Sequence, residues 1–569
     1  MNKGGFNTLY TKLKNELKES IEESLAKQRI TLDDEITFEE PPNPEMGDIS
    51  TNVAFTLAQK LKKSPVEIAE NIKQHIRLPL YFKKVETKGP YINFFINYTL
   101  FATKMVNYID QNYGELPEKE QRILLEHTSA NPNGPLHVGH LRNSILGDSL
   151  KRILQHAGYK VEAQYYVNDM GRQIAIIVWG MNKFNLKLDD DKKPDHAIGE
   201  VYFQANQKLE ETPEYNKEID DILYEYEQGE NARLIDAFEK VVEYCIDGIK
   251  STLKDLNIKM NLFKWESTFL RNGGVANVLE KLQPFTIQKD ILYLPLEKYG
   301  IDKELVLRRS NGTSLYVTRD LAYHQYKTKN SDISLDILGA DHKLAAKQLS
   351  IALDLSDNRP PEVVFYEFID LPEGSMSTRR GVFISVDEFI EESIQHAKDE
   401  ILRRDLDLTE KQVDEVARII GIGSIRFYIN QISPEKPITF KWEEALSFER
   451  GCASIQYAHA RACKLLSKVD NYDEYEEIIC DYELDDEEKE LIKELSRFTE
   501  IIRQSAEERR VHHLAEYTLS LSKAFNKFYK SQQVIGSEHE KLRIKLVDAS
   551  RITLKNSLKL LGIKAPQFM

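Results

Sequence analysis

The spacing of apolar and polar positions divides the chain into three parts. Residues 1 to about 115 combine helical spacing at 6–26, 54–61 and 65–76 with a strand-like run at 88–97, which predicts an α+β domain. From about 119 to 390, short apolar runs alternate with amphipathic helical segments, and this rhythm predicts a doubly wound parallel sheet. From about 395 to 569 the apolar spacing is nearly all helical, so an all-α domain is expected.

The alternating rhythm of the middle part breaks between about 183 and 262. Long acidic helical segments, for example across 216–255, replace the strands there. A run of like charges on a helix is typical of a solvated face, so no site is expected on it.

One stretch of the middle part carries candidate chemistry. A short apolar strand at 123–125 leads through turn formers at 131–135 into a helix whose entrance reads His137-Val138-Gly139-His140. Free N–H groups and the helix dipole attract anions at such an entrance. The two imidazoles can donate hydrogen bonds to phosphate oxygens, and Gly139 leaves room for a flat ring. The histidines taken alone would also suit a structural helix cap.

Composition changes this picture little. Apolar residues make up 41% and charged residues 30% of the 569 positions, which indicates a globular protein of about three or four domains. The net charge of −15 argues against a generally basic surface but allows a local basic groove. The four cysteines form no C-x-x-C pair, so neither a zinc site nor a disulfide framework is predicted. No long apolar run or leader pattern is found, and a cytoplasmic protein without membrane contact is expected.

The histidine block resembles the HIGH signature of class I aminoacyl-tRNA synthetases. With Glu126, Ser129 and Asn131 ahead of it and LRNSILGD behind it, the block is most similar to that of arginyl-tRNA synthetases. The resemblance covers essentially the whole chain in the family's order. It implies a Rossmann-like catalytic domain at 119–390 with a connective insertion at 183–262. It also implies an additional domain at 1–115 that docks on the tRNA D-arm, and an anticodon-binding domain at 395–569.

The resemblance implies an ATP-dependent ligase that activates L-arginine as arginyl-adenylate and transfers it to tRNA(Arg). The cofactors would be ATP and Mg²⁺, and the protein is expected to be a monomer. Tyr316 and Asp320 lie four residues apart, and a carboxylate beside a phenol suits a guanidinium. The resemblance implies that they bind the side chain of arginine. Without the resemblance, the pair would be interpreted as a surface aspartate and a core tyrosine. Further implied contacts are His137, Gly139, His140 and His342 for ATP. Ser129 and Asn131 would hold the carboxyl and amino groups of arginine, with Glu126 and Asn168 supporting them.

A second stretch, Gly374 to Gly381, resembles the KMSK loop in altered form. Met376 and Ser377 are expected at the nucleotide, but Ser375 and Thr378 replace the two lysines. Arg379 is therefore the cation expected to neutralise charge on pyrophosphate during catalysis.

The resemblance also implies contacts with tRNA. Tyr91 and Asn93 take the positions of base contacts in the N-terminal domain, or they are simply the solvent-side members of an alternating strand. Phe525, Tyr529 and Met569 take positions at the anticodon loop, or the two rings belong to the core of a helical bundle. Two other functions stay open: another class I synthetase, or a non-catalytic tRNA-binding paralogue of the same fold.

Overall fold

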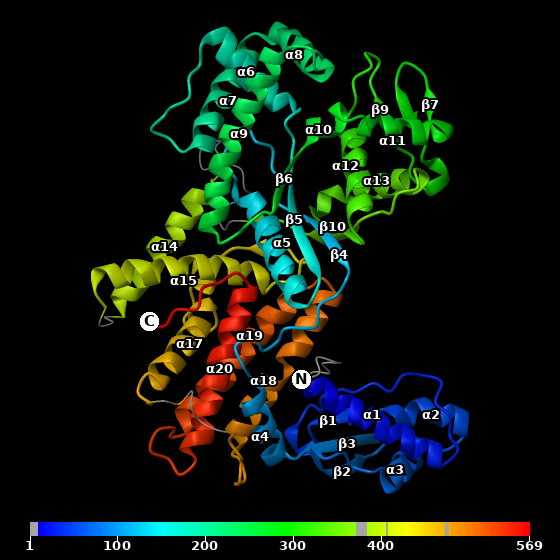
Figure 1. Cartoon of the computed structure of the whole chain (residues 1–569), viewed down its shortest axis with the longest axis vertical. Coiled ribbons are helices and arrows are strands. Elements are labelled where there is room, and N and C mark those ends of the chain that lie inside the picture. Colours follow the sequence, from blue (N-terminus) through cyan, green and yellow to red (C-terminus); the bar gives the residue numbers. More distant parts are fainter. Residues whose placement is uncertain (1–8, 371–383, 405–407, 471, 473–476) are drawn as a thin grey trace.

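We describe a computed structural model of the chain, which covers residues 9–370, 384–404, 408–470, 472 and 477–569. The parallel sheet and its insertion lie toward one end of the long axis, and the N-terminal part lies toward the other end beside the C-terminal helices (Figure 1). The predicted fold class, a parallel-sheet domain between an α+β and an all-α part, is confirmed. Among the helices in these ranges, none is long and apolar enough to cross a membrane.

The N-terminal part is a three-stranded antiparallel sheet covered by helices. Strand order is β1-β3-β2, and the register pairs Ser50 with Asn93. Helix α1 buries Leu13, Leu17 and Ile21 at helical spacing, as the sequence predicts. Its elements are α1 (Leu9–Lys27), β1 (Ile49–Thr51), α2 (Val53–Leu61), α3 (Pro65–His75), β2 (Phe82–Lys88), β3 (Tyr91–Ile96) and the connecting α4 (Tyr98–Tyr108).

The middle part is built on a five-stranded sheet in which neighbouring strands run parallel. Strand order is β11-β10-β4-β5-β6, so β4 lies in the centre. The chain leaves β4 toward β5 on one side and returns to β10 on the other. Ligands of such sheets bind at the carboxyl ends of the strands where the direction reverses, here between β4 and β10. The strands are β4 (Arg122–Glu126), β5 (Lys160–Val167), β6 (Leu262–Trp265), β10 (Ile333–Gly339) and β11 (Glu362–Tyr366).

Helices and an insertion surround this sheet. The predicted acidic helix across 216–255 is two helices, because Gly229 ends α8 with a left-handed φ of 75° and Asn231 caps α9. A small antiparallel sheet, β7-β8-β9, was not predicted; its strands are only two to four residues long. The elements are α5 (Val138–His156), α6 (Arg172–Phe184), α7 (Pro194–Glu211), α8 (Asn216–Gln228), α9 (Ala232–Asp255), α10 (Glu266–Arg271), α11 (Gly274–Leu282), β7 (Ile287–Gln288), β8 (Leu292–Leu294), β9 (Leu305–Arg308), α12 (Tyr316–Asn330) and α13 (Lys343–Leu355).

The C-terminal part is helical apart from one short strand pair. Helix α15 contains the glycines Gly421 and Gly423 in its interior, so they belong to no phosphate loop, as the helical spacing predicts. The elements are β12 (Ile369–Asp370), α14 (Val386–Arg403), α15 (Glu410–Asn430), β13 (Ile438–Thr439), α16 (Trp442–Ala445), α17 (Cys452–Leu466), α18 (Asp486–Glu507), α19 (His512–Ser531) and α20 (Glu540–Leu560).

Two buried arginines fix α5 against the C-terminal part. Arg142 of α5 donates to the backbone oxygens of Glu367 and Lys436 at 2.5 and 2.7 Å. Arg426 of α15 donates to Asp148 of α5 at 2.6 Å, and neither guanidinium is exposed. Removing one partner from a buried charge pair is strongly destabilising. The helix that carries the two signature histidines is therefore held from both the sheet side and the helical side.

Candidate active site

A strained turn follows β4 and sets the first side chains of the site. Thr128 and Ser129 have left-handed φ angles of 72° and 37°, a conformation that is unusual for a β-branched residue. Asn143 of α5 compensates by accepting the Thr128 N–H at 2.6 Å. The turn brings Ser129 Oγ to Glu126, to which it donates at 3.1 Å, while the Tyr166 N–H donates to Ser129 at 3.0 Å.

His137 and His140 close the first turn of α5 together. His137 is the N-cap, and its Nδ1 accepts the Gly139 N–H at 3.1 Å. His140 Nδ1 accepts the His137 N–H at 3.3 Å. Because both Nδ1 atoms accept, each neutral ring carries its proton on Nε2 and can donate from there. Burial lowers the pKa of both histidines, that of His140 to about 3, so the pair acts through hydrogen bonds.

Helix α12 presents a line of functional side chains on one face. Tyr316, Asp320 and His324 follow one another at four-residue spacing, and Lys327 comes three residues later. Tyr316 is half exposed, at 50%, whereas His324 and Lys327 are buried. The helix therefore runs from the mouth of the site into its floor.

These elements enclose one cavity of about 510 Å³. It is lined from β4 and its turn, α5, the end of β5, α12 and the end of β10, which is the crossover expected from the strand order. Asn168 Nδ2 donates to Asn131 at 3.2 Å across its edge. Eight residues predicted as ligand contacts line it: Glu126, Ser129, Asn131, His140, Asn168, Tyr316, Asp320 and His342.

The other predicted ligand contacts are not among the described residues that line the cavity. The His137 ring lies beside His140, with centroids 3.8 Å apart, and Gly139 is in the same turn. Arg379, Met376 and Ser377 lie outside the described residues.

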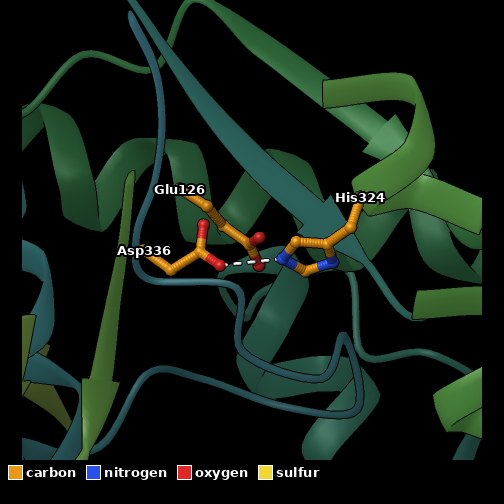
Figure 2. Close-up of side chains that lie close together, drawn as sticks. All are labelled: Glu126, His324 and Asp336. Atoms are coloured by element: carbon orange, nitrogen blue, oxygen red, sulfur yellow. Dashed lines mark hydrogen bonds and ion pairs between the residues drawn. The ribbon is translucent and has the colours of Figure 1, made fainter. Parts of the chain in front are cut away.

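A buried charge cluster forms the floor of the cavity. Lys327 Nζ lies 2.8 Å from Glu126 Oε2 and 2.6 Å from Asp336 Oδ1. Figure 2 shows Glu126, His324 and Asp336 converging from β4, α12 and β10, with His324 Nε2 2.8 Å from Asp336 Oδ2. Burial raises the pKa of Glu126; in Asp336 the same effect is outweighed by Lys327 and His324, which lower its pKa to about 2. Such a residue set can ligate a metal, but here the Lys327 ammonium already bridges both carboxylates.

Several residues of this site were not predicted from the sequence. Tyr166 lines the cavity and stacks on Tyr323 with centroids 4.4 Å apart, yet its buried hydroxyl has no hydrogen-bond partner among the described residues. His324 and Lys327 could have been found, because their spacing from Asp320 places them on the same helix face. Asp336 lies within an apolar strand, and only the structure shows what it contacts.

The residues predicted to contact tRNA differ in exposure. Tyr91 is 40% exposed and meets Phe55 edge-to-face at 5.6 Å, whereas the Asn93 side chain is buried. The expectation that an anticodon base stacks directly on Phe525 is wrong, because the ring is fully buried in the helical core and offers no free face. Tyr529 is partly exposed, with the Arg461 guanidinium 4.7 Å from its ring centroid. Met569 is also partly exposed.

Comparisons with known proteins cover the chain from end to end. Residues 104–436 match the model for the catalytic domain of class I tRNA synthetases (R). Residues 13–96 match the arginyl-tRNA synthetase N-terminal domain, and residues 455–569 match the DALR anticodon-binding domain.

The chain is also similar along nearly its whole length to individual proteins. The chain is 83% identical to an arginine–tRNA ligase of Methanosphaera stadtmanae over 99% of this chain and 100% of that one. It is 51% identical to the arginine–tRNA ligase of Methanothermobacter thermautotrophicus over the same shares. Among solved structures, the arginyl-tRNA synthetase of Thermus thermophilus superposes with a TM-score of 0.84 at 28% identity, over 98% of this chain and 100% of that one.

Proposed function

The chain belongs to the arginyl-tRNA synthetase family, and we propose on this basis that it is an arginine–tRNA ligase. In this reaction the carboxylate of L-arginine attacks the α-phosphorus of ATP, and the bond to pyrophosphate breaks. The terminal ribose hydroxyl of tRNA(Arg) then attacks the arginyl carbonyl, and AMP leaves. Neither step needs an enzyme nucleophile, so the protein contributes position and charge stabilisation.

One observation carries this proposal: Tyr316 and Asp320 line the same cavity as the signature histidine His140. A guanidinium reaching the α12 side would meet a carboxylate and a phenol, which are charge-assisted acceptors for its N–H groups. Ser129, Asn131 and Asn168 lie at the β4 and β5 ends and would hold the amino and carboxyl groups, with Glu126 behind them. The reacting carboxylate would then face the entrance of α5.

The ATP contacts would come from α5 and β10. His137 and His140 donate from Nε2 to phosphate or ribose oxygens, and Gly139 and His342 flank the nucleotide. Met376, Ser377 and Arg379 are proposed as further contacts from sequence, with Arg379 as the cation at pyrophosphate. Mg²⁺ would be held by the triphosphate, because Glu126, Asp320 and Asp336 are already engaged with Lys327 or His324.

Tyr166 adds a contact that the sequence did not reveal. A buried hydroxyl without a partner carries a desolvation cost that a ligand can relieve. Its ring centroid is 6.3 Å from that of Tyr316. We therefore include Tyr166 among the groups that bind the arginine side chain.

The tRNA would span the three parts of one chain, which favours a monomer acting in the cytoplasm where its substrates occur. Tyr91 with Phe55 offers an exposed aromatic pair at the N-terminal end, and Tyr529 and Met569 are partly exposed side chains of the C-terminal part. Base stacking on such rings is worth about 1–3 kcal/mol per base.

Charging of tRNA tests the function. With labelled arginine, ATP, Mg²⁺ and a tRNA(Arg) transcript, we expect an alkali-labile arginyl ester on the tRNA. A tRNA for another amino acid is the matched control. If no amino acid is esterified although the protein binds tRNA(Arg), the chain is a non-catalytic paralogue and the proposal is wrong.

A further inference from the structure

His324 lies between two carboxylates in the floor of the cavity. Its Nε2 is 2.8 Å from Asp336 Oδ2, and its Nδ1 is 3.1 Å from Asp320 Oδ1. Figure 2 marks the contact between His324 and Asp336 with a dashed line. Nδ1 is also 2.9 Å from the backbone oxygen of Asp320. All of these neighbours are acceptors, so both ring nitrogens must carry a proton. The geometry therefore makes His324 an imidazolium.

The charges around His324 leave one negative charge without a partner. Glu126, Asp320 and Asp336 supply three carboxylates from β4, α12 and β10, and Lys327 and His324 supply two cations. The cluster therefore has a net charge of −1. A guanidinium is a single positive charge, so a bound arginine side chain would neutralise the cluster. A neutral side chain of the same shape would leave the charge unpaired and buried, which is costly.

We propose that His324 is a positioning and specificity residue for the guanidinium, acting through Asp320. The inference rests on the proposed function and deepens it. Nδ1 holds Asp320 Oδ1, which leaves Oδ2 of the same carboxylate for the substrate. Asp336 anchors the ring from the other side, and Lys327 anchors Asp336.

A purely structural role would give a different pattern. An ion pair that only held α12 against β10 would change stability when broken, and would leave the substrate preference and its pH dependence unchanged. The position of Asp320 on the cavity wall, with its side chain 19% exposed, is what links the pair to the ligand.

Two substitutions separate these roles. His324→Asn keeps a donor near the Nδ1 position and loses the charge, and His324→Gln keeps a donor near the Nε2 position and loses the charge. His156→Gln is the control, because His156 lies largely buried at the far end of α5 from the signature turn, and burial lowers its pKa to about 4. The assay is ATP–pyrophosphate exchange with tRNA(Arg) present, followed over pH with arginine and citrulline.

We expect both His324 variants to raise the KM for arginine about 10- to 100-fold, the range for a lost charge-assisted partner. The KM for ATP should stay within about twofold, and discrimination against citrulline should fall. Because neither variant carries the imidazolium charge, the pH profile of kcat/KM for arginine should also differ from that of the wild type. His156→Gln should change none of these.

An unchanged arginine KM and pH profile in both His324 variants would overturn the inference, as would a loss of stability without a change in preference. Wild-type exchange with arginine is measured alongside, so failure of the proposed function is seen separately. If neither variant folds, ¹⁵N NMR spectra of histidine-labelled wild-type protein measure the protonation state of the His324 ring instead. Two protonated ring nitrogens on His324 at pH 8 are expected, and a neutral tautomer would contradict the proposal.

Discussion

The imidazole rings of His137 and His140 lie with their centroids 3.8 Å apart, and each uses its Nδ1 to accept a backbone N–H of the first turn of α5. The pair is thus both a helix cap and a source of two Nε2 donors at an anion-binding helix end. The structural role, capping of the helix, belongs to the Nδ1 atoms, and the functional role, donation to a ligand, belongs to the Nε2 atoms of the same rings.

His140→Asn should lower the rate of arginine activation about ten- to a thousandfold, the range for loss of a preorganised donor. Asparagine keeps an acceptor for the His137 N–H, so the melting temperature should change by only a few degrees. Stopped-flow or exchange kinetics beside a melting curve measure both quantities. Activation at the wild-type rate would mean that His140 only caps the helix.

Buried neutral histidines should make the protein sensitive to acid. Burial lowers the pKa of His127 and His156 to about 4, whereas an unfolded chain takes up those protons near pH 6.5. Because the unfolded state binds more protons in this window, stability falls as the pH drops from about 6.5 toward 4. Within this pH window, each of the two histidines lowers the free energy of unfolding by about 1.4 kcal/mol for each pH unit of acidification.

His156→Gln should therefore flatten the dependence of the free energy of unfolding on pH by about one proton between pH 6 and 5. Urea unfolding at several pH values measures the slope. A variant whose slope equals that of the wild type would show that His156 titrates normally in the folded state.

Asp320→Asn should raise the KM for arginine and leave the KM for ATP nearly unchanged. Loss of a charge-assisted acceptor costs roughly 1.5–3 kcal/mol, which corresponds to about 10- to 100-fold. Competition between arginine and citrulline in the exchange assay provides the measurement. If arginine is preferred to the same extent by the variant, another residue selects the guanidinium.

Tyr166→Phe separates a ligand contact from a core contact. The hydroxyl has no partner in the part of the chain that the structure describes, so removing it should leave the melting temperature unchanged or slightly higher. A ligand role predicts a rise of about three- to tenfold in the arginine KM, as for one neutral hydrogen bond. Equal arginine KM values in the two proteins would remove Tyr166 from the binding groups.

The buried Phe525 and the partly exposed Tyr529 should behave in opposite ways. Phe525→Ala creates a cavity and should cost about 3–5 kcal/mol, with a fall of several degrees in melting temperature. Tyr529→Ala should hold its melting temperature and raise the tRNA KM, because an exposed ring is lost from the anticodon surface. Aminoacylation with varied tRNA checks the second effect, and an unaltered KM would defeat the assignment of Tyr529.

The sequence predicted the order of the three parts and eight of the residues that line the cavity, because both depend on local signals. Strand and helix periods place β4, α5 and α12, and their motif residues then meet at the crossover between β4 and β10. The left-handed turn at Thr128 and Ser129 was not predictable, since neither residue type signals a positive φ.

Two further features arise only from contacts between distant segments. Phe525 and Tyr529 share a helix face in sequence, but packing against the other helices decides which ring is covered. The partnership of Asp336 with His324 and Lys327 depends on how β10 lies beside α12. Such tertiary contacts override local pattern, so the charge cluster could be read only from the structure.

The most direct test of the central claim is ATP–pyrophosphate exchange with each of the twenty amino acids, measured with tRNA(Arg) present. The site described here predicts exchange with arginine above all others, and little exchange with lysine, which lacks the planar guanidinium, or with neutral citrulline. Exchange driven equally well by another amino acid, or by none while tRNA(Arg) is bound, would contradict the assignment of this cavity as an arginine-activating site.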